Sequence, residues 1–158
     1  MDDEVASLLA ALRARGETLA SCESLTGGMV GAAITSVPGS SDVYRGGLVT
    51  YATDLKVSLA GVPRGVIDAY GVVSAEVALA MASGARASCG ADWGVATTGV
   101  AGPGAQDAVP AGTVWIAVVG PHTRLARPLS VEEDRSGVRR ESVLRAIELL
   151  RDSVEMIE

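Results

Sequence analysis

The spacing of apolar residues predicts a helix near each end of the chain. Near the N-terminus, apolar side chains recur every three or four residues, at Val5, Leu8, Leu9 and Leu12. Gly16 follows at a position where glycine commonly ends a helix. The same spacing is found near the C-terminus, at Val143, Ile147, Leu150 and Val154. Ser136 is the expected N-cap of this second helix.

Between these helices, short apolar runs alternate with small-residue helical segments. Strands are expected over 18–22, 46–51, 93–98, 113–119 and 125–131. Helices are expected over 27–35, over 54–59 with Thr53 as cap, over 63–69, and over 75–89 with Ser74 as cap. The turn Gly120-Pro121-His122 predicts that the last two strands form an antiparallel hairpin. This order predicts an α/β fold, a three-layer α/β/α sandwich with a mixed sheet, as a single domain over 1–158.

Composition narrows the classes of function. The chain has 158 residues and no Phe, so we expect one core built from Ala, Val, Leu and Ile. A net charge of −6 argues against nucleic-acid or anionic-membrane partners. Two cysteines, Cys22 and Cys89, are too few for a disulfide framework or a structural zinc site. No signal peptide and no membrane-spanning run is recognised, so a cytoplasmic location is expected.

Ser24 is the first candidate for catalysis. It follows the strand predicted over 18–22 and precedes Gly27-Gly28, where a helix is expected to begin. A strand end holds a side chain rigidly, and a helix N-terminus offers free N–H groups to an oxyanion or a phosphate. Serine before a first helical turn is also a common cap, so this local pattern leaves both interpretations open.

A serine nucleophile needs a base, and this chain offers few. His122 is the only histidine, and we expect it to be inert in an exposed turn. Lys56 is the only lysine beside twelve arginines, and arginine does not lose its proton in proteins. As a base, Lys56 needs its pKa lowered from about 10.4 by about 2 to 3, in a partly buried pocket. The alternative is that Lys56 is a surface residue of a short helix.

Ordered motifs make one family resemblance specific. The run Cys22-Glu23-Ser24-Leu25-Thr26-Gly27-Gly28 resembles the Ala-Glu-Ser-x-Thr-Gly-Gly motif of the CinA C-terminal-domain family, which includes stand-alone nicotinamide mononucleotide deamidases. Further similar blocks follow in the family's order: Pro38-Gly39-Ser40-Ser41, Gly46 to Tyr51, Tyr51 to Lys56, Gly71-Val72-Val73-Ser74, Thr98 to Pro103, Gly112 to Trp115, and Asp134-Arg135 with Val138-Arg139. Together they run from about Leu8 to Leu150, nearly the whole chain.

The resemblance implies an α/β/α domain that hydrolyses the carboxamide of nicotinamide mononucleotide. The products are nicotinate mononucleotide and ammonia, in pyridine-nucleotide recycling, and no metal or cofactor is implied. By this resemblance Ser24 is the nucleophile, Lys56 is its base, and Tyr51 supplies an orienting or proton-relaying hydroxyl. A homo-oligomer, a dimer or larger, is also implied.

Several further residues are candidates for binding this substrate. Backbone N–H groups of Thr97, Thr98 and Gly99 end a strand beside a glycine loop, where an oxyanion hole is expected. Arg135 and Arg139 are four residues apart on one helix face and either bind the phosphate or are solvated. The other candidates are small residues of the two glycine motifs, namely Thr26, Gly27, Gly28, Ala101 and Gly102. Thr26 either hydrogen-bonds Ser24 or caps the helix.

Two neighbours of Ser24 receive no catalytic role. Glu23 either pairs with an arginine or interacts with a helix dipole. Cys22, which stands where the family usually has Ala, is interpreted as a small buried strand residue.

The loop after Pro103 departs from the family pattern. It lacks the common Gly-Gly pair and the Lys before Pro, so we expect affinity or substrate choice to differ here if the loop borders the nucleotide. Glu133 also replaces the Gly of the late Gly-Asp-Arg block. Two alternatives to the deamidase stay open: a non-catalytic nucleotide-binding or regulatory domain of the same fold, and an amidase for another small amide.

Overall fold

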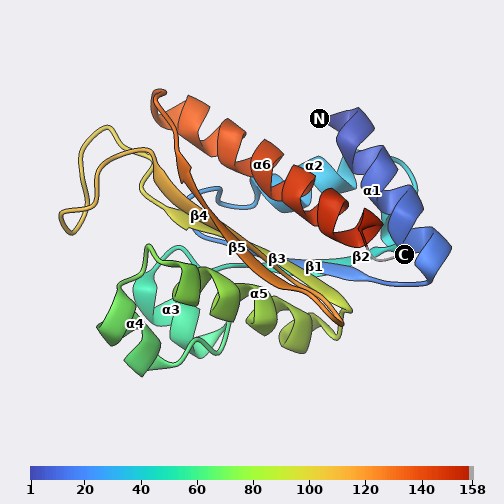
Figure 1. Cartoon of the computed structure of the whole chain (residues 1–158), viewed down its shortest axis with the longest axis horizontal. Coiled ribbons are helices and arrows are strands. Elements are labelled where there is room, and N and C mark those ends of the chain that lie inside the picture. The colour runs from blue at the N-terminus through green and yellow to red at the C-terminus, as the bar shows by residue number, and fades with distance from the viewer. Residues whose placement is uncertain (157–158) are drawn as a thin grey trace.

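The computed structural model describes residues 1–156, in which helices cover both faces of a five-stranded sheet (Figure 1). The strands are β1 (Leu19–Glu23), β2 (Tyr44–Val49), β3 (Trp93–Gly99), β4 (Thr113–Val119) and β5 (Arg124–Ser130). The α-helices are α1 (Asp2–Arg15), α2 (Met29–Thr35), α3 (Thr53–Ser58), α4 (Arg64–Tyr70), α5 (Ala75–Cys89) and α6 (Arg135–Glu155). A short 3-10 helix, η1, spans Ser40–Asp42.

The sheet is mixed, as predicted. Its strand order is β2-β1-β3-β4-β5, with β1 parallel to both neighbours and the remaining pairs antiparallel. The β4–β5 pair is the predicted hairpin, and His122 lies exposed in its turn. Helices α1, α2 and α6 lie on one face and α3, α4 and α5 on the other, so the α/β/α prediction is confirmed (Figure 1).

The two faces have different cores. The face under α1, α2 and α6 is filled with large aliphatic side chains and one indole, among them Leu8, Leu12, Leu19, Ile34, Trp93, Ile147 and Leu150. The face under α5 is rich in alanine, including Ala20, Ala78, Ala82, Ala85, Ala96 and Ala117. Small side chains let α5 approach the sheet closely, and a Cβ on Gly94 would collide with the Ala82 carbonyl. Full burial of each large aliphatic side chain stabilises the fold by about 1.5 to 3 kcal/mol.

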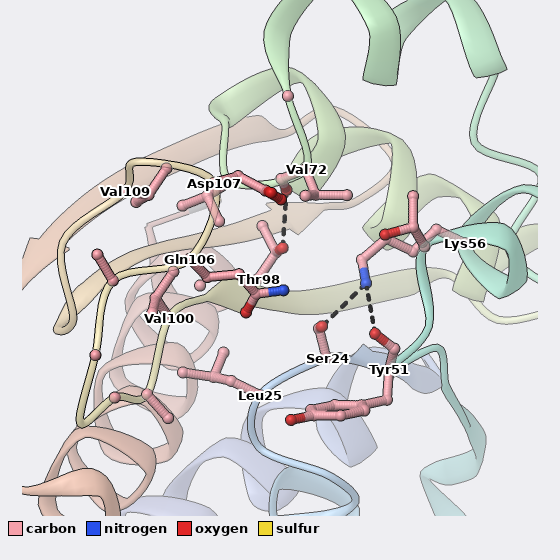
Figure 2. Close-up of a pocket in the computed structure, with 18 of the residues that line it drawn as sticks. Ser24, Leu25, Tyr51, Lys56, Val72, Thr98, Val100, Gln106, Asp107 and Val109 are labelled. Carbon is pink, nitrogen blue, oxygen red and sulfur yellow. Dashed lines mark hydrogen bonds between the residues drawn. The ribbon is translucent and has the colours of Figure 1, made fainter.

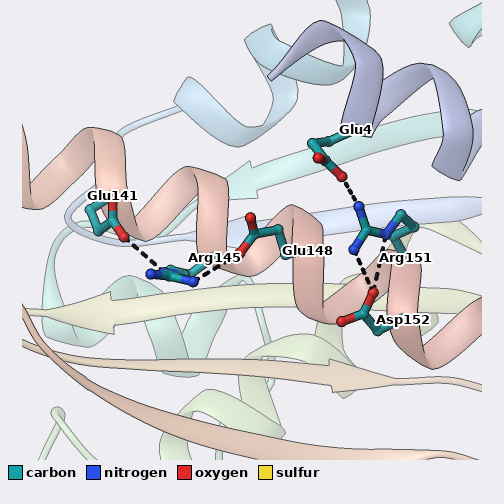
Figure 3. Close-up of polar contacts among 6 residues, drawn as sticks. All are labelled: Glu4, Glu141, Arg145, Glu148, Arg151 and Asp152. Carbon is teal, nitrogen blue, oxygen red and sulfur yellow. Dashed lines mark hydrogen bonds and ion pairs between the residues drawn. The ribbon is translucent and has the colours of Figure 1, made fainter.

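Ion pairs at the surface join the terminal helices. Arg151 of α6 contacts Glu4 of α1 and its neighbour Asp152, and Arg145 pairs with Glu141 and Glu148 along α6 (Figure 3). Partly exposed pairs of this kind contribute about 0 to 1 kcal/mol each. The apolar core therefore holds α1 on α6, and the Arg151–Glu4 ion pair adds one polar contact between the two helices.

Several sequence expectations about boundaries and caps are wrong. Strand β2 begins and ends two residues before the expected 46–51. Ala52 precedes α3 as its N-cap residue, and Thr53 makes no capping hydrogen bond. The last helix is capped by Asp134, whose Oδ1 accepts from Gly137 N at 2.8 Å, instead of by Ser136. Ser74, in contrast, caps α5 as expected, because its hydroxyl accepts from Val77 N.

Candidate active site

One cavity of about 730 Å³ opens at the carboxyl ends of β1 and β3. Its volume is in the range of small-molecule sites, and the ends of parallel strands are where α/β sheets usually bind ligands. The floor is formed by Ser24, Leu25 and Lys56, and the rim by Tyr51, Arg135 and the loop over 98–109. One side wall of the cavity is formed by residues within 67–73, including the apolar Ile67 and Val72.

Ser24 lies at the floor, one residue beyond β1. Its backbone N–H donates to Thr97 O at 3.0 Å, which continues the pairing of β1 with β3 past the last strand residue. Gly27 and Gly28 then turn the chain with φ of 56° and 103°, a conformation that side chains disfavour, and α2 begins at Met29. The serine is therefore held at both ends, and only 7% of its surface is exposed.

Lys56 reaches Ser24 from α3, which packs on the other side of the strand end. Its Nζ is 3.0 Å from Ser24 Oγ and 3.3 Å from Tyr51 O (Figure 2). The same nitrogen is 2.7 Å from Thr50 O. Lys56 is 2% exposed, and this burial lowers its pKa below the ordinary value, with the Cys22 thiol acting more weakly in the opposite direction. The surface-residue interpretation of Lys56 is therefore wrong.

The hydrogen bonds of Lys56 suit a neutral amine. A neutral amine has two N–H donors and one lone pair. As an ammonium, Lys56 donates to all three oxygens. When it is neutral, the Thr50 and Tyr51 carbonyls can accept its two N–H groups, and its lone pair can face the hydroxyl proton of Ser24. The arrangement can therefore deprotonate Ser24 at the moment it attacks an electrophile.

Tyr51 approaches this pair through its main chain. Its carbonyl contacts Lys56, whereas its ring turns away from Nζ in Figure 2. The hydroxyl lies 3.4 Å from a guanidinium nitrogen of Arg135, whose other nitrogen donates to Gly102 O at 2.6 Å. The structure thus places the Tyr51 hydroxyl at the rim, with Arg135, and not beside the Ser24 hydroxyl.

The end of β3 supplies the back of the cavity. Thr98 and Gly99 line it, and the Thr98 hydroxyl donates to Val72 O at 2.9 Å. Thr97 does not line it, because its side chain is buried and its hydroxyl pairs with that of Thr26 at 2.7 Å. Main-chain polar groups of alternate residues in a strand point to the same strand edge. The Gly99 N–H therefore points to the edge of β3 at which the Thr97 carbonyl accepts from Ser24 N, toward the segment that follows β1.

Glu23 is a buried anchor beneath the site. Its carboxylate accepts from Val30 N at 2.8 Å, Gly31 N at 3.2 Å and the Thr26 hydroxyl at 2.6 Å. It therefore satisfies the free N–H groups at the start of α2, which is the helix-dipole alternative from the sequence. Both roles expected of Thr26 are wrong, because its hydroxyl bonds Glu23 and Thr97 instead of Ser24 and does not cap α2.

The candidate site residues divide into two groups. Eight line the cavity: Ser24, Tyr51, Lys56, Thr98, Gly99, Ala101, Gly102 and Arg135. Five do not: Thr26, Gly27, Gly28, Thr97 and Arg139. Arg139 is turned toward the backbone behind the site, where it donates to Leu25 O at 3.0 Å and Thr26 O at 3.5 Å. The two arginines thus differ, since one supports the Ser24 loop and the other faces the cavity.

Sequence reasoning missed part of the wall. Ile67, Tyr70, Val72, Gln106 and Asp107 line the cavity, and none was a candidate. The departure of the loop after Pro103 from the family pattern was the one signal that pointed to Gln106 and Asp107. The apolar wall had no signal, because Ile67 and Val72 are ordinary core-type residues until the fold brings them to the cavity.

Cys22 carries no chemistry here. It is buried in β1, 3.4 Å from the Thr50 hydroxyl, and burial raises the pKa of its thiol to about 11. Among residues 1–156, no group of three His, Cys, Asp or Glu side chains is placed to hold a metal ion. No helix in that range is long and apolar enough to cross a membrane.

Comparison with known proteins points to one family. A family model described as CinA C-terminal domain matches residues 2–154. A CinA-like protein of Synechococcus sp. (strain RCC307) is 49% identical over 154 residues, which are 95% of this chain and 37% of that protein. A CinA-like protein of Frankia casuarinae is 44% identical, over 91% of this chain and 33% of its own length. The chain therefore spans about a third of the length of these curated relatives.

Solved structures agree in fold. The competence/damage inducible protein CihA from Agrobacterium tumefaciens is 32% identical with a TM-score of 0.92, covering 98% of this chain and 95% of that one. The competence damage-inducible protein A (ComA) from Klebsiella pneumoniae is 30% identical with a TM-score of 0.94, covering 99% and 98%. The similarity thus extends over nearly the full length of both solved chains.

Proposed function

Because the chain belongs to the CinA C-terminal-domain family, we propose that its cavity hydrolyses the carboxamide of nicotinamide mononucleotide, releasing nicotinate mononucleotide and ammonia. One observation carries the proposal. A buried Lys56 amine with a lowered pKa lies 3.0 Å from the hydroxyl of Ser24, at the floor of a ligand-sized cavity. This is the arrangement that an acyl-transfer nucleophile and its base require.

The chemistry follows from the hydrogen bonds of Lys56. The neutral amine takes the proton of Ser24 as Oγ bonds to the carboxamide carbon, and the carbonyl oxygen becomes an oxyanion. Collapse of this intermediate breaks the C–N bond, and Lys56 returns the proton to the leaving nitrogen, which departs as ammonia. Water, deprotonated by Lys56, then attacks the acyl-serine ester. Collapse of this second intermediate breaks the ester C–O bond, Lys56 returns the proton to Ser24 Oγ, and the acid product leaves as its carboxylate.

The Gly99 N–H is the backbone group best placed to stabilise the oxyanion. The Ser24 N–H is engaged with Thr97 O, so it does not serve as it does in many serine hydrolases. Gly99 lines the cavity and presents its N–H toward the end of β1. One such donor is worth about 10²- to 10³-fold in rate.

The rest of the cavity suits a mononucleotide of this kind. Ile67, Tyr70 and Val72 offer an apolar wall to the pyridine ring, and the Arg135 guanidinium at the rim suits the phosphate. Tyr51 shares the rim with Arg135 and acts there on the substrate's polar end. Arg139, which supports the Ser24 loop, has no place in phosphate binding.

An ammonia-release assay tests the proposal, with nicotinamide, its riboside and its mononucleotide compared as substrates. The wild-type protein should prefer the mononucleotide, and Ser24→Ala should lower kcat by about 10³-fold or more. Ser36→Ala, an exposed serine of α2's C-terminal end, is the matched control. Wild-type turnover from both Ser24→Ala and Lys56→Ala would overturn the assignment.

Other results of this comparison of substrates would support the alternative functions. Tight nucleotide binding without ammonia would indicate a non-catalytic binding domain, and preference for a different amide would keep the chemistry but change the substrate. A cytoplasmic location and a homo-oligomeric state, a dimer or larger, remain predictions. Light scattering on the purified protein tests the second.

A further inference from the structure

The side chain of Gln106 is a cavity group that the proposed chemistry has not used. Gln106 lines the cavity, and Figure 2 shows its carboxamide directed into the space in front of Ser24 and Thr98, across from Lys56. Gln106 is exposed, and within residues 1–156 its hydrogen bonds are those of its main chain. It therefore presents a free donor and a free acceptor to whatever occupies the cavity.

A tight turn holds Gln106 in this position. Gln106 N donates to Val109 O at 3.0 Å and Val109 N donates to Gln106 O at 2.9 Å, so the two residues form an isolated antiparallel bridge. The two residues between them, Asp107 and Ala108, have φ of 50° and 64°, which is the pattern of a type I′ turn. The loop thus has a defined shape that aims Gln106 inward, although most of its residues are exposed.

Two neighbouring donors of the cavity are already engaged, and the Gly99 N–H remains for the substrate oxygen. The Ser24 N–H donates to Thr97 O, and the Thr98 hydroxyl donates to Val72 O. A carboxamide bound over Ser24 offers a carbonyl oxygen that needs donors and an amide nitrogen whose N–H groups need an acceptor. Gln106 carries a donor and an acceptor side by side on one planar group, so it can meet both needs of a carboxamide at once.

We propose that Gln106 pairs with the substrate carboxamide as one amide pairs with another, and so selects amides over the corresponding acids. This rests on the proposed function of Ser24 and Lys56. The Gln106 NH₂ donates to the substrate carbonyl oxygen, and the Gln106 Oε1 accepts from the substrate NH₂. Both hydrogen bonds persist when Oγ of Ser24 adds to the carbon, because the oxygen then carries the negative charge and the nitrogen still bears its protons.

The same pairing disfavours the product. A carboxylate has two acceptor oxygens and no donor, so one of them faces the Gln106 Oε1 without a proton between them. The acid is therefore held less tightly than the amide, which favours product release. A site that lacked Gln106 would lose this discrimination while keeping Ser24 and Lys56 in place.

Binding to the Ser24→Ala protein separates this inference from the chemistry. Calorimetry with nicotinamide mononucleotide and with nicotinate mononucleotide should show the amide bound about tenfold or more tightly. Gln106→Leu, made in the same Ser24→Ala background, should abolish this preference. Gln106→Glu should weaken binding of the amide, because a carboxylate offers no donor to the carbonyl oxygen, but it should keep a preference for amide over acid, because it repels the product carboxylate. An amide preference that survives unchanged in Gln106→Leu overturns the proposal.

Turnover supplies the second test. In the active protein, Gln106→Leu should lower kcat/KM by about 10²-fold, the usual effect of losing one oxyanion donor. Ala108→Val should lower it too, because a β-branched residue disfavours the positive φ of the turn, and Ala108→Gly should leave it unchanged. If the wild type releases ammonia and the kcat/KM of Gln106→Leu is within about threefold of the wild-type value, the inference about Gln106 is overturned and the proposed amidase activity is kept. If binding shows an amide preference that depends on Gln106 but the wild type releases no ammonia, the pairing is supported and the proposed amidase activity is overturned.

Discussion

The floor and the rim of the cavity are built differently. At the floor, Ser24 and Lys56 are buried, and they hydrogen-bond to the main chain of β3 and of the segment that follows β2. At the rim, Tyr51, Arg135 and Gln106 are exposed, and they come from two loops and a helix N-terminus. The contrast teaches that the proposed catalytic pair depends on the core for its position, whereas the residues proposed to select the substrate lie on exposed segments.

The largest expected effect is the loss of activity when Lys56, the proposed base at the floor of the cavity, is replaced. Lys56→Met removes the proton acceptor, and Lys56→Arg keeps the charge but not the basicity, so both should lower kcat by about 10²- to 10⁴-fold. Ammonia release measures the effect, with circular dichroism to verify folding. A Lys56→Arg protein that retains full turnover would contradict the role of base.

Loss of the anchor beneath the floor should act on stability. Glu23→Ala leaves the Val30 and Gly31 N–H groups and the Thr26 hydroxyl without their buried acceptor, so the free energy of unfolding should fall by about 2 to 4 kcal/mol. Urea unfolding measures the change. The exposed Glu132→Ala is the control and should stay within about 0.5 kcal/mol of wild type. Equal stability of the two variants would show that the buried carboxylate anchors nothing.

At the rim, the expected change is in KM. Arg135→Gln should raise KM for the mononucleotide by about tenfold and have little effect on KM for the riboside, because the proposed partner of the guanidinium in the substrate is the phosphate. Arg140→Gln on the same helix is the matched control, since Arg140 is exposed and does not line the cavity. Steady-state kinetics with both substrates measures these KM values. An equal rise in KM for the riboside would argue against a contact between Arg135 and the phosphate.

The smallest expected effect is a pH dependence of stability at the floor. Burial lowers the pKa of Lys56 in the folded protein below its unfolded value. At a pH between these two pKa values, the unfolded chain binds more protons than the folded protein. The free energy of unfolding therefore rises with pH across this range, and this stabilisation is lost as the pH falls through the folded pKa. One proton accounts for at most about 1.4 kcal/mol per pH unit.

Lys56→Met isolates this term. Urea unfolding across the alkaline range should show a shallower rise for the variant than for the wild type, and identical slopes would mean that Lys56 titrates alike in both states. In the active enzyme the same group predicts that kcat/KM increases with pH up to the lowered pKa of Lys56, since the neutral amine is the base.

Local patterns predicted the elements better than their ends. The apolar spacing that includes Leu8 and Leu12 gave α1 its helix and buried face, and Gly16 ends it in the left-handed conformation as expected. Caps were less predictable, because Asp134 and Ser136 are both good capping residues two positions apart. The choice of Asp134 depends on where α6 meets β5 and the sheet, which no local pattern contains.

The sequence by itself determined the layered α/β fold, a core built without Phe, and Ser24 and Lys56 as the pair to examine. These follow from periodicity, from ordered motifs and from the scarcity of other bases, all of which are local or compositional. Only the tertiary structure decided the contact of Lys56 with Ser24 across 32 residues, the separation of Arg135 from Arg139, and the inward aim of Gln106. The physical reason is that burial lowers a lysine pKa and directs a loop side chain only after distant segments have packed around them.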